Sequence, residues 1–244
     1  QSGVRREPIG VVGAVAPWKF PLLLTLWKVG PALAAGNSVV VKPDEHTPLS
    51  ILEFARIAER NGLPPGVLNV VPGDGREAGA RLASHPDVGK IAFTGSTAVG
   101  REIMRLAAGT VKQVTLELGG KGPSIVLDDA DLDMTADGIL YGCFVYSGQV
   151  CESGTRAIVP RKIHDEFVER LVRRAKTIQV GATHDWDTDM GPVIDGTQQA
   201  RILDFIRDAE AEGATVVLGG RALDGPGFWI EPTIVTGVTN DMRI

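Results

Sequence analysis

The feature that most constrains the fold is a regular alternation of short apolar runs with longer helix-like segments. In the first half of the chain, apolar runs typical of buried strands recur between amphipathic segments of helical spacing. Strands separated in this way are joined by right-handed crossovers and form a mostly parallel sheet. Ligands bind such sheets at the carboxyl ends of the strands. The pattern therefore predicts an α/β fold and directs the search for functional residues to the strand ends.

The expected elements divide into two groups. In the first group we predict strands at 11–16, 39–41, 67–71, 88–93 and 114–118, and helices at 22–35, 49–60, 76–83 and 98–107. A kink is expected in the first helix at Gly30-Pro31. After Gly119-Gly120 the character changes, with strands at 124–127, 156–159 and 216–218 and helices at 132–146, 163–178 and 200–211. We therefore predict a domain of residues 1–119 followed by a second domain of residues 120–244.

Composition narrows the class of protein. The 244 residues are 43% hydrophobic and 23% charged, which excludes an intrinsically disordered chain. The net charge of -5 argues against a nucleic-acid partner. The longest apolar stretch, Leu22 to Ala35, is interrupted by Lys28, Gly30 and Pro31, so no membrane span is expected. Two cysteines form no disulfide framework, which favours a reducing, cytoplasmic setting.

Two residues could carry covalent chemistry. Cys151 follows Gly148 and precedes Gly154 in an expected loop, where a thiolate could attack a carbonyl carbon. The alternative is a buried thiol that only packs, and this is the favoured interpretation for Cys143 in its expected helix. Glu117 lies at the end of an expected buried strand, before Gly-Gly. Such a carboxylate acts either as a general base or in an ion pair with a nearby cation.

Three turns could hold a nucleotide. Gly95 and Ser96 lead from a strand into a helix whose N-terminus can bind a phosphate. Lys42 and Glu45 follow a buried strand and could hold the two hydroxyls of a ribose, or they could form a solvated turn. The segment 71–75 begins like a dinucleotide fingerprint, but position 78 is Ala, so we interpret it first as a turn.

The order and spacing of these motifs resemble the NAD(P)-dependent aldehyde dehydrogenase superfamily. The resemblance rests on Pro17-Trp18-Lys19-Phe20-Pro21, Val41-Lys42-Pro43-Asp44-Glu45, Phe93-Thr94-Gly95-Ser96, Leu116-Glu117-Leu118-Gly119-Gly120-Lys121 and Gly148-Gln149-Val150-Cys151. It extends through Met190-Gly191-Pro192-Val193 and Gly227-Phe228-Trp229-Ile230-Glu231-Pro232-Thr233. It implies a parallel-sheet cofactor domain followed by an α/β catalytic domain. Because it covers roughly half of a typical family subunit, both domains are expected to be truncated.

The resemblance also implies a role for individual residues. Cys151 matches the nucleophile, and its backbone N–H matches half of the oxyanion hole. Glu117 matches the base that activates water, and Lys28 matches a lysine near the proton path. The residues implied for the cofactor are Trp18, Lys42, Glu45, Gly75, Gly95, Ser96, Gly100 and Leu118. Glu45 would favour NAD over NADP by repelling a 2′-phosphate.

One residue departs from the family pattern. The family reads Pro-Trp-Asn-Phe-Pro, and its Asn supplies the other half of the oxyanion hole, whereas this chain carries Lys19. A lysine can also donate a hydrogen bond, but it is longer and charged.

The resemblance predicts an NAD-dependent enzyme that oxidises a small-molecule aldehyde to a carboxylic acid and forms a homo-oligomer when full length. The alternatives are a CoA-acylating relative, in which CoA resolves the thioester, and a non-catalytic NAD-binding relative. A thiol hydrolase that pairs Cys151 with His164 has no evident orienting partner. No metal site is expected.

Overall fold

The computed structural model describes residues 3–244. It separates into two compact units, residues 1–119 and residues 120–244. Each unit has its own hydrophobic core and is described by itself.

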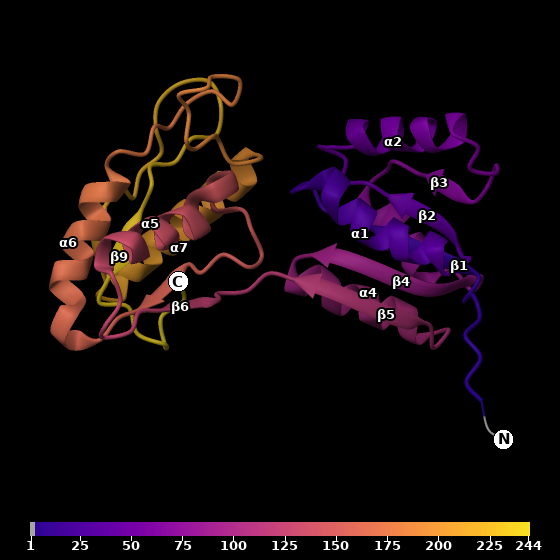
Figure 1. Ribbon diagram of the computed structural model, residues 1–244, viewed down its shortest axis with the longest axis horizontal. Helices are drawn as coiled ribbons and strands as arrows, with labels where there is room; N and C mark the ends of the chain where they lie inside the picture. Colours follow the sequence, from indigo (N-terminus) through magenta and orange to yellow (C-terminus); the bar gives the residue numbers. More distant parts are fainter. Residues whose placement is uncertain (1–2) are drawn as a thin grey trace. The chain divides into compact units, whose positions relative to one another are not determined.

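The first unit is built on a five-stranded parallel sheet (Figure 1). Its strands are β1 (Val11–Val15), β2 (Ser38–Lys42), β3 (Leu68–Val70), β4 (Val88–Gly95) and β5 (Gln113–Leu118), in the order β3-β2-β1-β4-β5. All four pairings are parallel. The chain moves outward from β1 through β2 to β3, and then returns to the other side of β1 with β4. This places the topological switch point between β1 and β4. The expected α/β fold with a parallel sheet is confirmed.

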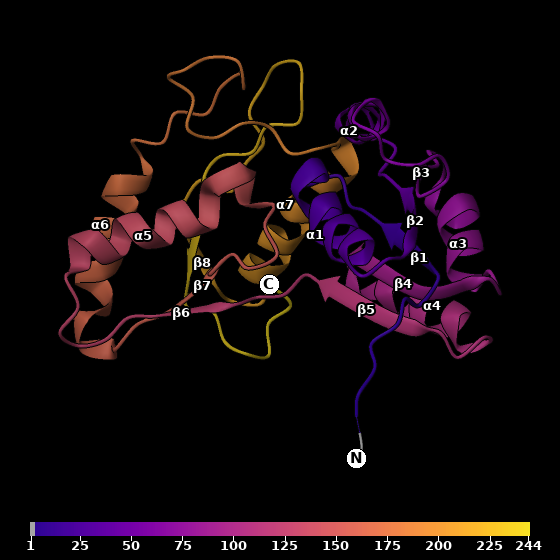
Figure 2. The same ribbon diagram turned by 45° about the vertical axis from the view of Figure 1, so that its right-hand side comes forward.

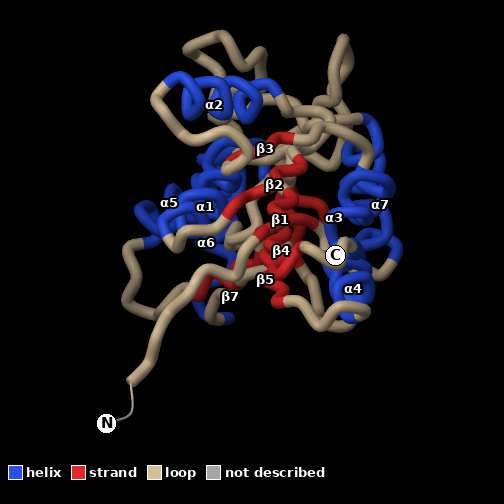
Figure 3. The backbone as a smooth tube through the Cα atoms, turned by 90° about the vertical axis from the view of Figure 1, so that its right-hand side faces the viewer, coloured by secondary structure: helices blue, strands red, loops and turns tan. Residues whose placement is uncertain are grey.

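Helices cover both faces of this sheet. They are α1 (Pro21–Ala34), α2 (Leu49–Arg60), α3 (Ala80–Ser84) and α4 (Thr97–Ala108). Figures 2 and 3 show α1 on one face and α3 with α4 on the opposite face. Side chains along β1 alternate between the two faces of the sheet. Val12 and Ala14 pack in the core beneath α1 and α2, whereas Val15 packs in the core beneath α3 and α4.

One predicted helix in the first unit is of a different type, and one expectation about burial is wrong. The predicted helix 76–83 starts as a π-helical turn, η1 (Gly75–Gly79), and continues as the short α3. Asp74 caps this turn by accepting a hydrogen bond from Arg76 N at 2.6 Å. β5 is an edge strand with alternating exposed and half-buried residues, so Glu117 is exposed and does not end a buried strand.

The first helix, in which a kink at Gly30-Pro31 is expected, continues through Pro31 to Ala34.

The second unit combines three helices with two small sheets. Its helices are α5 (Leu132–Phe144), α6 (His164–Ala175) and α7 (Gly196–Ala211), with 3-10 turns η2 (Val145–Gly148) and η3 (Arg161–Ile163). Its strands are β6 (Pro123–Ile125) parallel to β7 (Arg156–Ile158), and β8 (Thr215–Leu218) antiparallel to β9 (Ile234–Thr236). The sequence analysis missed β9. The core contains Val126, Ala136, Leu140, Phe167, Leu171, Ala175 and Ile234.

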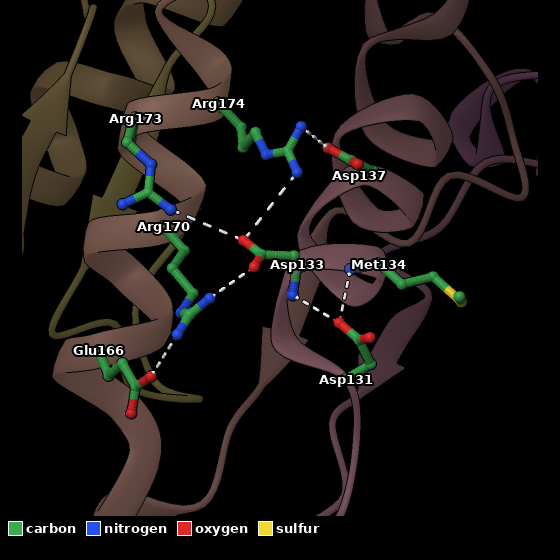
Figure 4. Close-up of polar contacts among 8 residues, drawn as sticks. All are labelled: Asp131, Asp133, Met134, Asp137, Glu166, Arg170, Arg173 and Arg174. Carbon is green, nitrogen blue, oxygen red and sulfur yellow. Dashed lines mark hydrogen bonds and ion pairs between the residues drawn. The ribbon is translucent and has the colours of Figure 1, made fainter.

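Charged side chains join α5 to α6 (Figure 4). Arg170 donates to Asp133 and to Glu166, each at 2.7 Å, and these two carboxylates hold the pKa of Arg170 above its ordinary value. Arg174 adds a contact with Asp137 at 3.4 Å. Asp131 caps α5 by accepting from the backbone of Met134 and Asp133. The Arg170–Asp133 and Arg174–Asp137 pairs link the two helices, and the segment that carries Cys151 follows the end of α5.

The predicted helix 132–146 ends early for a local reason. Tyr146 and Ser147 adopt left-handed backbone angles, with φ values of 51° and 58°, which interrupt the helix after Phe144. Gly148 continues this region with φ 72°. Three successive residues with positive φ turn the chain sharply before Cys151.

Candidate functional site

The carboxyl edge of the first sheet gathers most of the sequence-predicted cofactor residues. Because all five strands are parallel, their carboxyl ends meet at one edge. Trp18 and Lys19 follow β1, Lys42 ends β2, Gly95 ends β4 and Leu118 ends β5. The edge includes the switch point between β1 and β4, where open α/β sheets bind ligands.

Lys42 and Glu45 form a defined pair at this edge. The Nζ atom of Lys42 lies 2.7 Å from Oε2 of Glu45, and the Lys42 side chain is 5% exposed while that of Glu45 is 49% exposed. The hydrogen bond from Lys42 lowers the pKa of Glu45, although burial opposes the shift. The pair therefore presents a charged carboxylate acceptor beside a lysine donor, a combination that suits a diol.

The turn from β4 to α4 offers backbone donors. Ser96 caps α4, and its Oγ accepts from Val99 N at 3.3 Å. A side chain at Gly95 would collide with the ring of Phe93, and a Cβ at Gly100 would lie 2.8 Å from Leu118 Cδ2. Gly100 thus lets α4 approach β5 closely, and Leu118 packs against the helix, whereas Gly95 leaves room for the ring of Phe93 in its own strand. The N-terminus of this twelve-residue helix is a position where a phosphate group fits.

An open, largely apolar pocket borders Lys42 and extends toward Val11 and Val88 at the amino ends of β1 and β4. A cavity of about 380 Å³ is lined by residues of α3, of the π-helical turn and of the strands, among them Lys42, Val71, Ala78, Arg81 and Leu82. This volume is within the range of small-molecule sites. Gly75 begins the π-helical turn, and nothing lies within 4 Å of the position that a Cβ would take there. The polar groups that could hold a nucleotide are therefore those at the carboxyl edge, namely the Lys42–Glu45 pair and the N-terminus of α4.

Trp18 and Lys19 lie in the turn that precedes α1. Trp18 is half-buried, and its carbonyl oxygen accepts from Thr47 Oγ1 at 3.2 Å. Phe20 has φ 45° and ends the turn, and Pro21 then begins the helix, as is common at that position. Lys19 is half-buried between them. The turn therefore fixes the backbone at Lys19, while the four-carbon side chain sets the reach of its ammonium group.

Lys28 connects α1 to β4. Its Nζ donates to Thr94 Oγ1 at 2.6 Å and to the Leu24 carbonyl oxygen at 3.2 Å. Thr94 is 2% exposed and immediately precedes Gly95. Sequence reasoning missed Thr94 as a partner of Lys28, because only the packing of α1 against the sheet brings the two side chains together. These contacts give Lys28 a positioning role at the end of β4.

An exposed apolar stripe follows Lys19 along α1. Leu23 is 46% exposed and Trp27 is 63% exposed, one helical turn apart. These two side chains are neighbours on one face of the helix and form a small exposed apolar surface. Sequence reasoning placed this segment on a helix but missed its exposed face, because helical periodicity alone does not show which stripe is buried.

In the second unit, Cys151 lies in a turn that is held on both sides. Ser147 Oγ donates to the Gly191 carbonyl oxygen at 2.8 Å, and Ile194 N donates to Gln149 Oε1 at 3.0 Å. The motif at 148–151 is thereby tied to the motif at 190–193, two segments that the sequence analysis noted separately. The Sγ atom of Cys151 donates to Glu152 Oε2 at 2.8 Å. Sequence reasoning missed Glu152.

Cys143 has a different environment. It lies in α5, and burial raises the pKa of its thiol above the ordinary value of 9.0, while the charge of Lys121 opposes that shift. Its placement in the helix agrees with the expected packing role.

Residues 3–244 contain neither a metal-binding cluster nor a membrane-spanning helix. No three His, Cys, Asp or Glu side chains there gather in a way that could hold a metal ion. None of the helices in that range is both long enough and apolar enough to cross a bilayer.

The fold is that of an α/β protein whose first unit has a parallel sheet and whose second unit carries Cys151. The family model of the aldehyde dehydrogenase family matches residues 1–244, so the chain belongs to that family and the resemblance is confirmed. It is 48% identical to aminoaldehyde dehydrogenase 2, peroxisomal, of Pisum sativum, covering 100% of this chain and 49% of that protein. It is 50% identical to retinal dehydrogenase 2 of Homo sapiens, covering 98% of this chain and 46% of that protein.

A solved structure shows the same fold. The NAD+ complex of an aldehyde dehydrogenase from Bacillus cereus superposes with a TM-score of 0.95 at 47% identity, covering 98% of this chain and 49% of that one. The chain thus spans about half the length of the relatives that it matches.

Proposed function

We propose that this chain is part of an NAD-dependent aldehyde dehydrogenase that oxidises an aldehyde to a carboxylic acid. The observation that carries the proposal is Cys151, which lies in an anchored turn of a chain that matches the aldehyde dehydrogenase family throughout. In this assignment the unit of residues 1–119 binds the cofactor, and the unit of residues 120–244 carries the nucleophile.

The residues proposed to hold NAD lie at the carboxyl edge of the first sheet. Lys42 and Glu45 hold the adenosine ribose, and the N-terminus of α4 at Ser96 holds the pyrophosphate. Gly75, Gly95 and Gly100 allow close approach, while Trp18 and Leu118 line or support the cleft. A solved relative with NAD+ supports this cofactor. NADP is disfavoured by the charge of Glu45.

The chemistry proposed for the protein side chains has two stages. The Cys151 sulfur attacks the aldehyde carbon, and the backbone N–H of Cys151 donates to the oxygen as it gains charge, which forms a thiohemiacetal. Bound NAD supplies the hydride acceptor that makes oxidation to the thioester possible. Glu117 then takes a proton from water, which attacks the thioester carbon and releases the carboxylic acid and the Cys151 thiol.

Two alternatives make distinct predictions. In a CoA-acylating enzyme the thioester passes to CoA, but the presence of Glu117 and the names of the relatives do not favour it. In a non-catalytic relative, Lys19 would leave the oxyanion hole incomplete. Acyl-CoA as the product would support the first, and NAD binding with no NADH formation would support the second.

The substrate is proposed to be a small aldehyde with an apolar portion. The exposed side chains of Leu23 and Trp27 on α1 offer an apolar surface that begins one turn after Lys19. An aliphatic chain or an aromatic ring would bury this surface on binding.

The proposed location is the cytoplasm, because two cysteines suit a reducing compartment, and the proposed assembly is a homo-oligomer. The names of two relatives place them in peroxisomes and chloroplasts, which are the alternatives.

The proposal is tested on the full-length protein with a panel of aliphatic and aromatic aldehydes, each assayed with NAD and with NADP. We expect NADH and the carboxylic acid in equal amounts, with no need for CoA. Cys151→Ala serves as the control, since it should bind NAD and form no NADH. Absence of NADH with every aldehyde, in a protein that binds NAD, would contradict the proposal.

A further inference from the structure

Glu152 contacts the sulfur atom that the proposed function assigns as the nucleophile. The Sγ–H of Cys151 donates to Glu152 Oε2 at 2.8 Å. Cys151 is half-buried and Glu152 is exposed. The contact joins two adjacent residues of one turn, so it needs no closure of a long loop to form.

The turn is fixed on both sides of this contact. On the N-terminal side, Ser147 and Gln149 are bonded to Gly191 and Ile194. On the C-terminal side, Ser153 is 3% exposed, and Ser153 N donates to the Val150 carbonyl oxygen at 3.4 Å. The next residue, Gly154, lies against Ser124 so closely that a Cβ would collide with the Ser124 side chain. The backbone at 151–152 is therefore held in place, and only side-chain rotation separates the carboxylate from the sulfur.

Other charged groups of the adjoining segments are engaged elsewhere. Arg156 Nη1 donates to Asn240 Oδ1 at 3.2 Å, and Asp195 caps α7 by accepting from Gln198 N at 2.7 Å. Asp189 accepts from Gln179 N at 2.8 Å, and the charge of Lys121 acts on Cys143. The carboxylate of Glu152 contacts Sγ directly.

A carboxylate in this position stabilises one protonation state of the thiol. It accepts a hydrogen bond from the neutral S–H, and its negative charge repels a thiolate at the same distance. Both effects favour the protonated form. We propose that Glu152 is a positioning residue that holds Cys151 as a hydrogen-bonded thiol between turnovers and so limits its reaction with stray electrophiles. This inference rests on the proposed function only for the assignment of Cys151 as the nucleophile.

Alkylation of the full-length protein by iodoacetamide tests the inference without aldehyde or cofactor. The rate at Cys151 is followed by mass spectrometry of its peptide between pH 6 and pH 10, with the Cys143 peptide of the same digest as an internal reference. In Glu152→Gln the midpoint of the Cys151 profile should fall by about one pH unit or more. Below the midpoint this corresponds to alkylation about tenfold faster than in the wild type.

The matched control is Glu169→Gln, which removes the same charge from an exposed position on α6. It should leave the profile of Cys151 unchanged. Glu152→Asp keeps the charge near the sulfur and should stay closer to the wild type than Glu152→Gln does. Glu152→Ala provides a second neutral variant, and each variant is checked for folding by circular dichroism before alkylation.

Equal midpoints in the wild type and in a folded neutral variant would overturn the inference. An equal shift in Glu169→Gln would also overturn it, because the effect would then come from net charge. The alkylation profile is independent of catalysis. If the proposed function is wrong, the wild type will form no NADH, but the effect of Glu152 on the alkylation of Cys151 will still be seen.

Discussion

The Nζ atom of Lys42, at the buried end of β2, lies 2.7 Å from Oε2 of Glu45 in the exposed turn that follows. The contact joins a 5% exposed lysine to a 49% exposed carboxylate, so the lysine is fixed by the sheet and in turn orients the carboxylate. A 2′-phosphate that enters this position meets a negative charge already held in place.

The first prediction concerns the choice of cofactor. In the full-length enzyme, kcat/KM should favour NAD over NADP by at least about tenfold, or about 1.4 kcal/mol. Two charges about 4 Å apart near a surface interact by about 4 kcal/mol before solvent and side-chain movement reduce the effect. Glu45→Gln should therefore narrow the preference, whereas Glu59→Gln, an exposed control on α2, should not. Equal efficiency of the wild type with both cofactors would exclude Glu45 as the selector.

The second prediction concerns stability at acid pH. The hydrogen bond from Lys42 holds the pKa of Glu45 below its ordinary value of 4.5 in the folded protein. The unfolded chain therefore binds a proton first as the pH falls, so the contribution of Glu45 is fully present above pH 4.5 and is lost as the pH falls through the lower folded value. Urea unfolding should show a wild-type advantage over Glu45→Gln at pH 6 that shrinks below pH 4. An advantage that grows on acidification would contradict this sign.

The third prediction separates the two cysteines. Cys151→Ala should abolish aldehyde oxidation while NAD binding persists, because the cofactor residues belong to the other unit. Cys143→Ala should keep most of the activity, since Cys143 packs within α5 and burial raises the pKa of its thiol. NADH formation and NAD titration on both variants check this. Loss of activity in the opposite order would show that the nucleophile is misassigned.

The fourth prediction separates the two half-reactions. If Glu117 activates the water that hydrolyses the thioester, Glu117→Gln should slow deacylation more than acylation. Stopped-flow measurements should then show a burst of NADH near one equivalent, followed by slow turnover. The exposure of Glu117 on β5 leaves its carboxylate accessible to water, as this role requires. Equal losses in both phases would indicate a structural or thiol-activating carboxylate.

The fifth prediction concerns Lys19. Its four-carbon stem is a poor match to a position that a short amide occupies in the family, so the oxyanion should lack one donor. Removal of one such donor costs about 2.7–4 kcal/mol in other enzymes, roughly 100- to 1,000-fold in rate. We therefore expect Lys19→Asn to form NADH faster than the wild type in a single turnover. A slower variant whose Cys151 alkylation also slows near neutral pH would show instead that the Lys19 ammonium stabilises the thiolate.

Sequence alone determined the features that depend on local spacing. The apolar runs at β1, β2 and β4 and the amphipathic segments between them predicted the parallel sheet, because the periods of two and 3.6 are intrinsic to strands and helices. Lys42 and Glu45, three residues apart at the end of a strand, were predicted to act together on a ribose, whereas their direct contact appears only in the structure. The family followed from the order of five motifs.

The tertiary structure decided what depends on strand order and backbone torsion. Glu117 is exposed because β5 lies at the edge of the sheet, and no period within 113–118 shows which strand is at the edge. β9 has three residues, too few to show a period, and it is defined by its pairing with β8. The turn that leads to Cys151 is formed by positive φ angles from Tyr146 to Gly148, and distant segments anchor it. This turn depends on contacts between residues more than 40 positions apart, namely the hydrogen bonds of Ser147 with Gly191 and of Gln149 with Ile194. The local spacing of residues does not predict such contacts.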